Sequence, residues 1–249
     1  EGKPRVLRTQ GERWDGEPVD PVVPVPKPPT SQQEPKKPSG EGDGEDGSDE
    51  GKRSKRIKIK LADGKERMID SMIATSFWNP DGTPMSASEF LKRLFGDLPD
   101  LFKDEDELRK LWSKPDTRKD LIQSLEEKGY GMDELSEMRR LIQAEQSDLY
   151  DVLAYVAYAS PTITREERVD GSKAAFFASK SDKQKEFLAF VLEHYIREGV
   201  LELGREKLPE LLELKYHSVP DAVQSLGEVK LIRELFVGFQ EYLYEARMA

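Results

Sequence analysis

Two segments of the chain contain the residue types of a metal-dependent nuclease site, in which two carboxylates hold Mg²⁺ and a lysine orients the attacking water. Pro220-Asp221 precedes Glu228-Val229-Lys230, and Pro115-Asp116 precedes Glu126-Glu127-Lys128. Such a site needs the aspartate on one strand and the Glu-x-Lys on its neighbour, whereas both matches lie at or inside predicted helical segments. Because 35% of the residues are charged, chance also accounts for such loose matches.

We therefore expect no catalytic residues and no metal ligands in this chain. A divergent Mg²⁺-dependent nuclease built from Asp221, Glu228 and Lys230 stays open as the alternative. Cysteine is absent, which excludes thiol catalysis, disulfides and cysteine-containing zinc sites. His194 and His217 lie on separate predicted elements, so we expect structural roles for both. No Gly-Lys pair has the spacing of a phosphate-binding loop, and we expect no cofactor.

A basic cluster formed by Lys55, Arg56, Lys58 and Lys60 could follow the phosphates of DNA. Six acidic residues between positions 41 and 50 precede it directly, and their field should nearly cancel that of the cluster beyond about 8 Å. We favour a solvated face that protects a strand edge, and keep a DNA-contacting hairpin clamp as an alternative.

Two arginines, Arg165 and Arg168, fall in the first turn of a predicted helix that follows Pro161. Arginine opposes the helix dipole there, a cost that a neighbouring or external carboxylate or phosphate bound to each would offset. We favour a plain surface role and keep the bound anion as the alternative. Together with the four hairpin cations, they are our candidate contacts with a partner or with DNA.

The elements that must position these residues begin with a hairpin. Ile57, Ile59 and Leu61 alternate with cations, and Asp63-Gly64 predicts a type I′ turn between two antiparallel strands. From Ser86 onward the spacing of apolar residues is helical. Predicted helix starts are Ser86 or Ser88, Asp116 or Thr117, Asp133, Asp148, Thr164 and Ser181, with capping boxes from Ser86 to Glu89 and from Thr164 to Glu167.

The fold class is mainly α, an irregular bundle of about eight to nine helices with one small N-terminal β-hairpin, preceded by a disordered tether. The segment 149–158 is apolar on nearly all sides, so we expect it at the centre of the bundle. Apart from Trp14, all aromatic residues lie from Phe77 onward, which predicts a core confined to residues 77–249.

Composition divides the chain into three parts. Residues 1–54 are rich in proline, then in glycine and acid, and we expect a disordered linker. Residues 55–76 form the hairpin that leads into the core, and residues 77–249 form a helical C-terminal domain.

The net charge of -10 gives the protein no general electrostatic reason to bind DNA or an anionic membrane. No apolar stretch is long enough to span a membrane, so we expect a cytoplasmic protein, and a first residue other than Met suggests a piece of a longer polypeptide.

Several stretches in this order resemble the C-terminal region of the restriction (R, HsdR) subunit of type I restriction endonucleases. The resemblance covers about residues 55–247. It rests mainly on Asp148-Leu149-Tyr150-Asp151-Val152-Leu153, followed by Thr164-Arg165-Glu166-Glu167-Arg168 and by a long helix ending at Tyr195-Ile196-Arg197-Glu198-Gly199.

The resemblance implies a parent subunit that translocates DNA with ATP and Mg²⁺ and cleaves it. It implies that the nuclease and ATPase parts precede this region, which docks onto the methyltransferase (M) and specificity (S) subunits and meets DNA through the whole complex. None of the family's catalytic motifs maps onto positions in this chain. We therefore expect an assembly module without catalytic residues.

Overall fold

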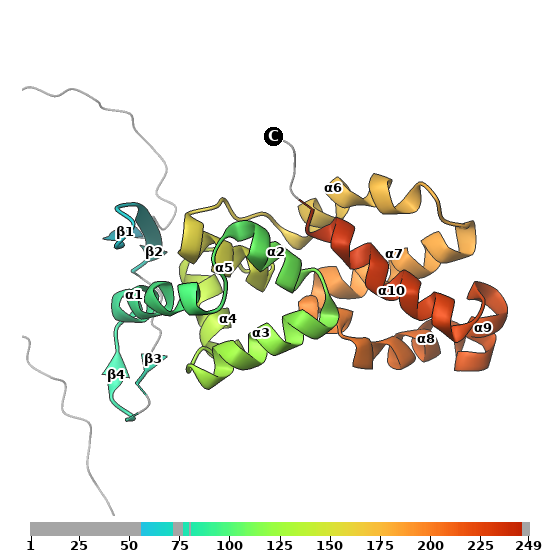
Figure 1. Ribbon diagram of the computed structural model, residues 1–249, viewed down its shortest axis with the longest axis horizontal. Helices are drawn as coiled ribbons and strands as arrows, with labels where there is room; N and C mark the ends of the chain where they lie inside the picture. Colours follow the sequence, from blue (N-terminus) through green and yellow to red (C-terminus); the bar gives the residue numbers. More distant parts are fainter. Residues whose placement is uncertain (1–55, 72–76, 80, 246–249) are drawn as a thin grey trace, which may run out of the picture. The chain divides into compact units, whose positions relative to one another are not determined.

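A computed structural model describes residues 56–71, 77–79 and 81–245 (Figure 1). The chain divides into two units, Glu1–Asp49 and Glu50–Ala249, and all the described residues belong to the second. The predicted disordered tether and Lys55 lie outside the described residues. Across the part that is described, no helix is both long enough and apolar enough to cross a membrane.

An antiparallel hairpin opens the described part, with β1 (Arg56–Lys60) paired to β2 (Glu66–Asp70). The predicted type I′ turn is wrong, because that turn needs positive φ at both central residues. Instead the Leu61 carbonyl accepts a hydrogen bond from the Gly64 N–H, and Gly64 has φ +78° at the end of a three-residue loop. Among the described residues, β3 (Phe77–Trp78) and β4 (Pro84–Met85) form a second, very short hairpin that the sequence did not predict.

The first group of helices follows. It consists of α1 (Ala87–Asp97), α2 (Glu105–Trp112), α3 (Pro115–Glu127), α4 (Met132–Leu141) and α5 (Leu149–Tyr158). The capping box from Ser86 to Glu89 is confirmed. The predicted starts of α3 and α4 are wrong: α3 begins with Pro115, which suits a first helical position because it needs no N–H there, and α4 begins after Gly131.

The second group consists of α6 (Arg165–Phe177), α7 (Asp182–Glu198), α8 (Leu208–Tyr216), α9 (Val219–Leu226) and α10 (Val229–Leu243), with two 3₁₀ segments, Val200–Leu203 and Arg205–Lys207, before α8. The capping box from Thr164 to Glu167 and the α7 cap at Ser181 are confirmed. Helix α9, capped by Ser218, was not predicted. The mainly α fold class is confirmed, with ten α-helices in the described residues.

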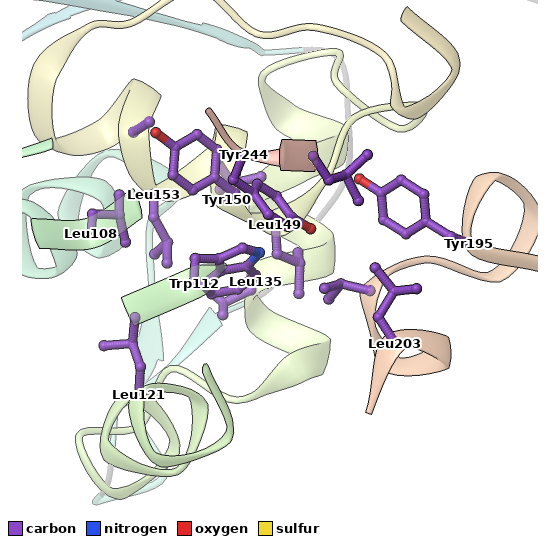
Figure 2. Close-up of a cluster of buried hydrophobic side chains, with 14 of the residues drawn as sticks. Leu108, Trp112, Leu121, Leu135, Leu149, Tyr150, Leu153, Tyr195, Leu203 and Tyr244 are labelled. Atoms are coloured by element: carbon purple, nitrogen blue, oxygen red, sulfur yellow. The ribbon is translucent and has the colours of Figure 1, made fainter. Parts of the chain in front are cut away.

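Helix α5, predicted to lie at the centre of the bundle, is the most deeply buried helix of the first group and packs against α1, α2 and α4. The core extends from its Leu153 through Trp112 to Tyr195 of α7 and Tyr244 beyond α10 (Figure 2). Buried Ile59 and Ile69 of the hairpin belong to the same core. The expectation of a core confined to residues 77–249 is therefore wrong, because the alternating residues of the hairpin supply an apolar face that needs cover.

Candidate functional site

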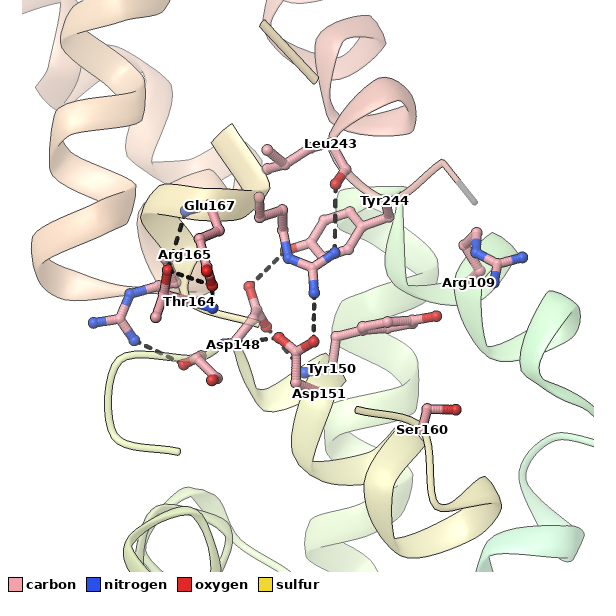
Figure 3. Close-up of polar contacts among 12 residues, drawn as sticks. Arg109, Asp148, Tyr150, Asp151, Ser160, Thr164, Arg165, Glu167, Leu243 and Tyr244 are labelled. Atoms are coloured by element: carbon pink, nitrogen blue, oxygen red, sulfur yellow. Dashed lines mark hydrogen bonds and ion pairs between the residues drawn. The ribbon is translucent and has the colours of Figure 1, made fainter. Parts of the chain in front are cut away.

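The N-terminus of α5 carries a buried carboxylate with three hydrogen-bond donors. Asp148 accepts from the backbone N–H of Tyr150 at 3.0 Å and from the hydroxyl group of Tyr244 at 2.7 Å (Figure 3). It also accepts from the hydroxyl group of Tyr195 at 2.7 Å. Burial, followed by the nearby Asp148, raises the pKa of both hydroxyl groups well above the usual value, so they stay protonated as donors. This one side chain caps α5 and joins it to α7 and to the end of α10.

One turn further along α5, Asp151 forms a buried ion pair with Arg168 of α6. The distance between the carboxylate and the guanidinium is 2.7 Å, and the side chains are 4% and 6% exposed. The guanidinium also lies 5.1 Å from the ring centroid of Tyr150 and 4.9 Å from that of Tyr244, and donates to the Leu243 carbonyl at 3.5 Å (Figure 3). The favoured surface role for Arg168 is wrong, because the side chain is buried; the structure instead has the alternative, a neighbouring carboxylate partner.

Burial and the ion pair act in opposite directions on the pKa of each member of this pair. It raises the pKa of Asp151 to about 6, because the lost hydration outweighs the attraction of Arg168. For Arg168, burial acts to lower the pKa, but the Asp151 carboxylate and its other neighbours outweigh it and raise the pKa above the usual value. The arginine therefore stays charged, and the carboxylate is the member of the pair that can titrate.

Arg165 is also buried at the start of α6. Its guanidinium donates to the carbonyl of Ile196 in the last turn of α7, at 2.8 Å, and to the carbonyl of Ser147 at 2.9 Å. Carbonyl groups at a helix C-terminus have no partner within the helix and carry partial negative charge, which balances the cost of an arginine at a helix N-terminus. In this structure Arg165 and Arg168 bind groups of the chain itself, so their contact with a partner or DNA stays a prediction.

The C-terminus of α5 is held by a residue that sequence reasoning missed. Arg67 of β2 is fully buried and donates to the carbonyls of Tyr155 at 2.7 Å and Val156 at 2.9 Å, as well as to the Asp63 carboxylate at 3.0 Å. Lys65 adds a bond to the Tyr158 carbonyl at 3.1 Å. A signal existed, because Arg67 lies opposite Ile59 on the inward face of the hairpin.

The predicted cations on the hairpin lie on its outer face. Arg56, Lys58 and Lys60 are exposed, Lys58 pairs with Glu66 at 3.2 Å, and Arg56 donates to Gln143. Lys55 lies outside the described residues. Contact of these cations with DNA or a partner stays a prediction.

The nuclease alternative does not fit the structure. Asp221 accepts from the Ser218 N-cap hydroxyl in the first turn of α9, whereas Glu228 and Lys230 begin α10 and Lys230 faces Glu234. The paired strands that would bring these groups together do not occur at these positions, so the geometry that this alternative requires is not present there. The second match fails in the same way, because Asp116 lies in α3 and pairs with Arg205 at 2.8 Å. Within residues 56–71, 77–79 and 81–245, no group of three or more His, Asp or Glu side chains could hold a metal ion.

A cavity of about 910 Å³ lies among α2, α5, α6 and the end of α10, with the Asp151–Arg168 pair in its lining. Arg109 and Glu105 of α2 also line it and pair with each other at 3.4 Å. Glu105 also accepts from the Ser160 hydroxyl at 2.9 Å, so the charged groups of this cavity join α2 to the segment after α5, and α5 to α6.

The described part of the chain is thus a helical domain with an integral hairpin, whose central helix is braced at both ends by buried charges. Residues 88–244 match the family model described as EcoEI R protein C-terminal. Because this match covers more than half of the chain, the chain belongs to that family, the C-terminal domain of the type I restriction enzyme R protein. The resemblance seen in the sequence is confirmed. Neither the curated proteins nor the solved structures gave a match.

Proposed function

We propose that this domain is a non-catalytic assembly module of the R subunit, which attaches the motor and nuclease of the parent to the M and S subunits. ATP and Mg²⁺ serve the parent subunit, DNA is met through the whole complex, and the assembly works in the cytoplasm. Family membership supports the connection to a type I restriction enzyme.

The observation that carries the proposal is the set of buried polar cross-links between the two helix groups. Besides the Asp151–Arg168 pair, Arg118 of α3 donates to the Leu203 carbonyl at 3.0 Å and to Oε1 of Gln240 in α10 at 2.9 Å. Such bonds demand a defined geometry, and breaking one leaves a buried charge without a partner. A module that transmits force between a motor and its anchor needs this resistance to relative movement of its parts.

Recovery of the chain with the purified cognate M–S complex tests the proposal. The full chain and a chain without residues 1–54 should both be recovered, and neither should cleave DNA in the presence of ATP and Mg²⁺. Failure of the full chain to be recovered contradicts the proposal, and loss on deletion alone places the contact within residues 1–54.

A DNA-contacting hairpin is the second candidate function, favoured by the exposure of Arg56, Lys58 and Lys60. Three phosphate contacts would give a slope of about -3 in log affinity against log salt. Fluorescence anisotropy with a duplex at several salt concentrations measures this slope, and a flat response would remove this candidate.

A further inference from the structure

A cavity of about 460 Å³ lies away from the braces of α5, between the start of α3, the start of α8 and the middle of α10. Three cations from three separate elements line it: Lys119, Arg205 and Arg233. Leu208 and the buried Phe236 give it apolar walls.

Two of the three cations are available to a ligand. Arg205 pairs with Asp116 at 2.8 Å, whereas no carboxylate of the described residues lies within ion-pairing distance of Lys119 or Arg233. One further carboxylate, Glu206, lines the cavity. The first turns of α3 and α8 border it, and each helix N-terminus contributes a partial positive charge of about half a unit. The cavity therefore favours an anion.

The apolar lining decides which kind of anion fits. Leu208, Pro209, Phe236 and Val237 would leave a bare phosphate beside groups that cannot hydrogen-bond to it, but they suit a carboxylate whose neighbour is an apolar side chain. A DNA duplex carries a phosphate every few ångströms along each strand, so its further phosphates would approach the remaining acids on a chain of net charge -10. An acidic polypeptide can present a single carboxylate to a concave site.

We propose that this cavity is the docking point for an acidic segment of a partner subunit. An Asp or Glu side chain lies between Lys119 and Arg233, and an adjacent apolar side chain contacts Leu208 and Phe236. The inference rests on the proposed function, because it names the site at which the M–S complex is held.

Charge reversal of the two available cations tests the site directly. Lys119→Glu with Arg233→Glu should weaken binding of the chain to the immobilised M–S complex about 100-fold, because like charges then face each other across the contact. Lys92→Glu with Lys183→Glu changes the net charge by the same amount on α1 and α7, outside the cavity, and should change affinity less than about threefold. All four positions are exposed, so both variants should fold, and thermal melts of each variant check this.

Equal binding by the wild type and both variants overturns the docking point and leaves the assembly function intact. No binding by the wild type overturns the assembly function, and a second measurement then decides about the cavity. Acetyl-Glu-Leu-amide titrated into the isolated chain should shift the NMR signals of Lys119 and Arg233 and should have no effect on the charge-reversed variant. If a 12-base-pair duplex shifts these NMR signals and the peptide does not, the proposal that the cavity binds an acidic polypeptide segment is wrong.

Discussion

At the scale of single residues, the Asp151–Arg168 pair stands out because both partners are almost fully buried. Replacing Arg168 with Met keeps the apolar length of the side chain but leaves the Asp151 carboxylate without its partner. We expect a loss of about 3 to 5 kcal/mol in the free energy of unfolding, measured by urea denaturation. The matched control is Arg140→Met, which removes a surface pair with Glu137 and should cost about 0.5 kcal/mol or less. Equal losses in the two variants would contradict a stabilising role for the buried pair.

The pH dependence of stability should report the raised pKa of Asp151. Its folded-state pKa of about 6 exceeds the ordinary 3.8, so the folded protein binds a proton that the unfolded chain releases between about pH 4 and 6. This contribution to stability is complete below about pH 4 and is lost as the pH rises through 6.

Asp151→Asn provides the comparison, because its side chain does not titrate. Between pH 7 and pH 5 the wild type should gain about 1 kcal/mol of unfolding free energy relative to this variant. Denaturation at both pH values measures the difference. A constant difference, or one that shrinks on acidification, would show that the carboxylate keeps an ordinary or lowered pKa.

At the scale of elements, the hairpin forms part of the helical domain although it lies before the matched residues 88–244. Arg67→Ala removes the bonds to the α5 carbonyls and leaves them buried, so we expect a loss of about 3 kcal/mol in the free energy of unfolding. Lys58→Ala on the outer face should change it by less than about 0.5 kcal/mol. If Arg67→Ala changes the free energy of unfolding as little as Lys58→Ala does, the hairpin does not contribute to the stability of the helical domain.

The two ends of α5 show which contacts a sequence reveals. Asp148 and Thr164 were identified as caps because a capping side chain bonds to backbone only two or three residues away. Arg67 lies 88 residues from the Tyr155 carbonyl that it binds, and no local pattern encodes such a pairing. Helix α9 was not predicted as a separate helix because its eight residues make little more than two turns and give only a short apolar periodicity.

The candidate site shows the same division between local and distant signals. The position of Arg168 at the start of a helix suggested a carboxylate partner, but the choice of Asp151 depends on how α5 and α6 pack. The cavity with Lys119 and Arg233 brings together residues that are more than a hundred positions apart and belong to different helices. Its recognition requires the tertiary arrangement, since each cation alone looks like an ordinary surface residue.

At the scale of the whole domain, Arg118 decides whether the two helix groups move as one body. Its guanidinium binds the Trp112 carbonyl in the first group, and Leu203 and Gln240 in the second. Arg118→Leu removes the charge while keeping apolar volume, but it leaves the Leu203 carbonyl with one donor fewer. We expect the junction to loosen before the separate groups unfold, because the most extensive helix–helix contacts lie within each group.

Hydrogen exchange measures this loosening. In Arg118→Leu, amides of α3 and α10 should exchange about tenfold or more faster, whereas those in the interior of α5 should change little, and affinity for the M–S complex should fall because the competent arrangement is less populated. Lys110→Ala, an exposed change on α2, should leave all three measurements unaltered. A uniform increase in exchange across the domain would mean that Arg118 supports overall stability alone, with no particular part in joining the two groups, and the mechanical role of the buried cross-links would then be wrong.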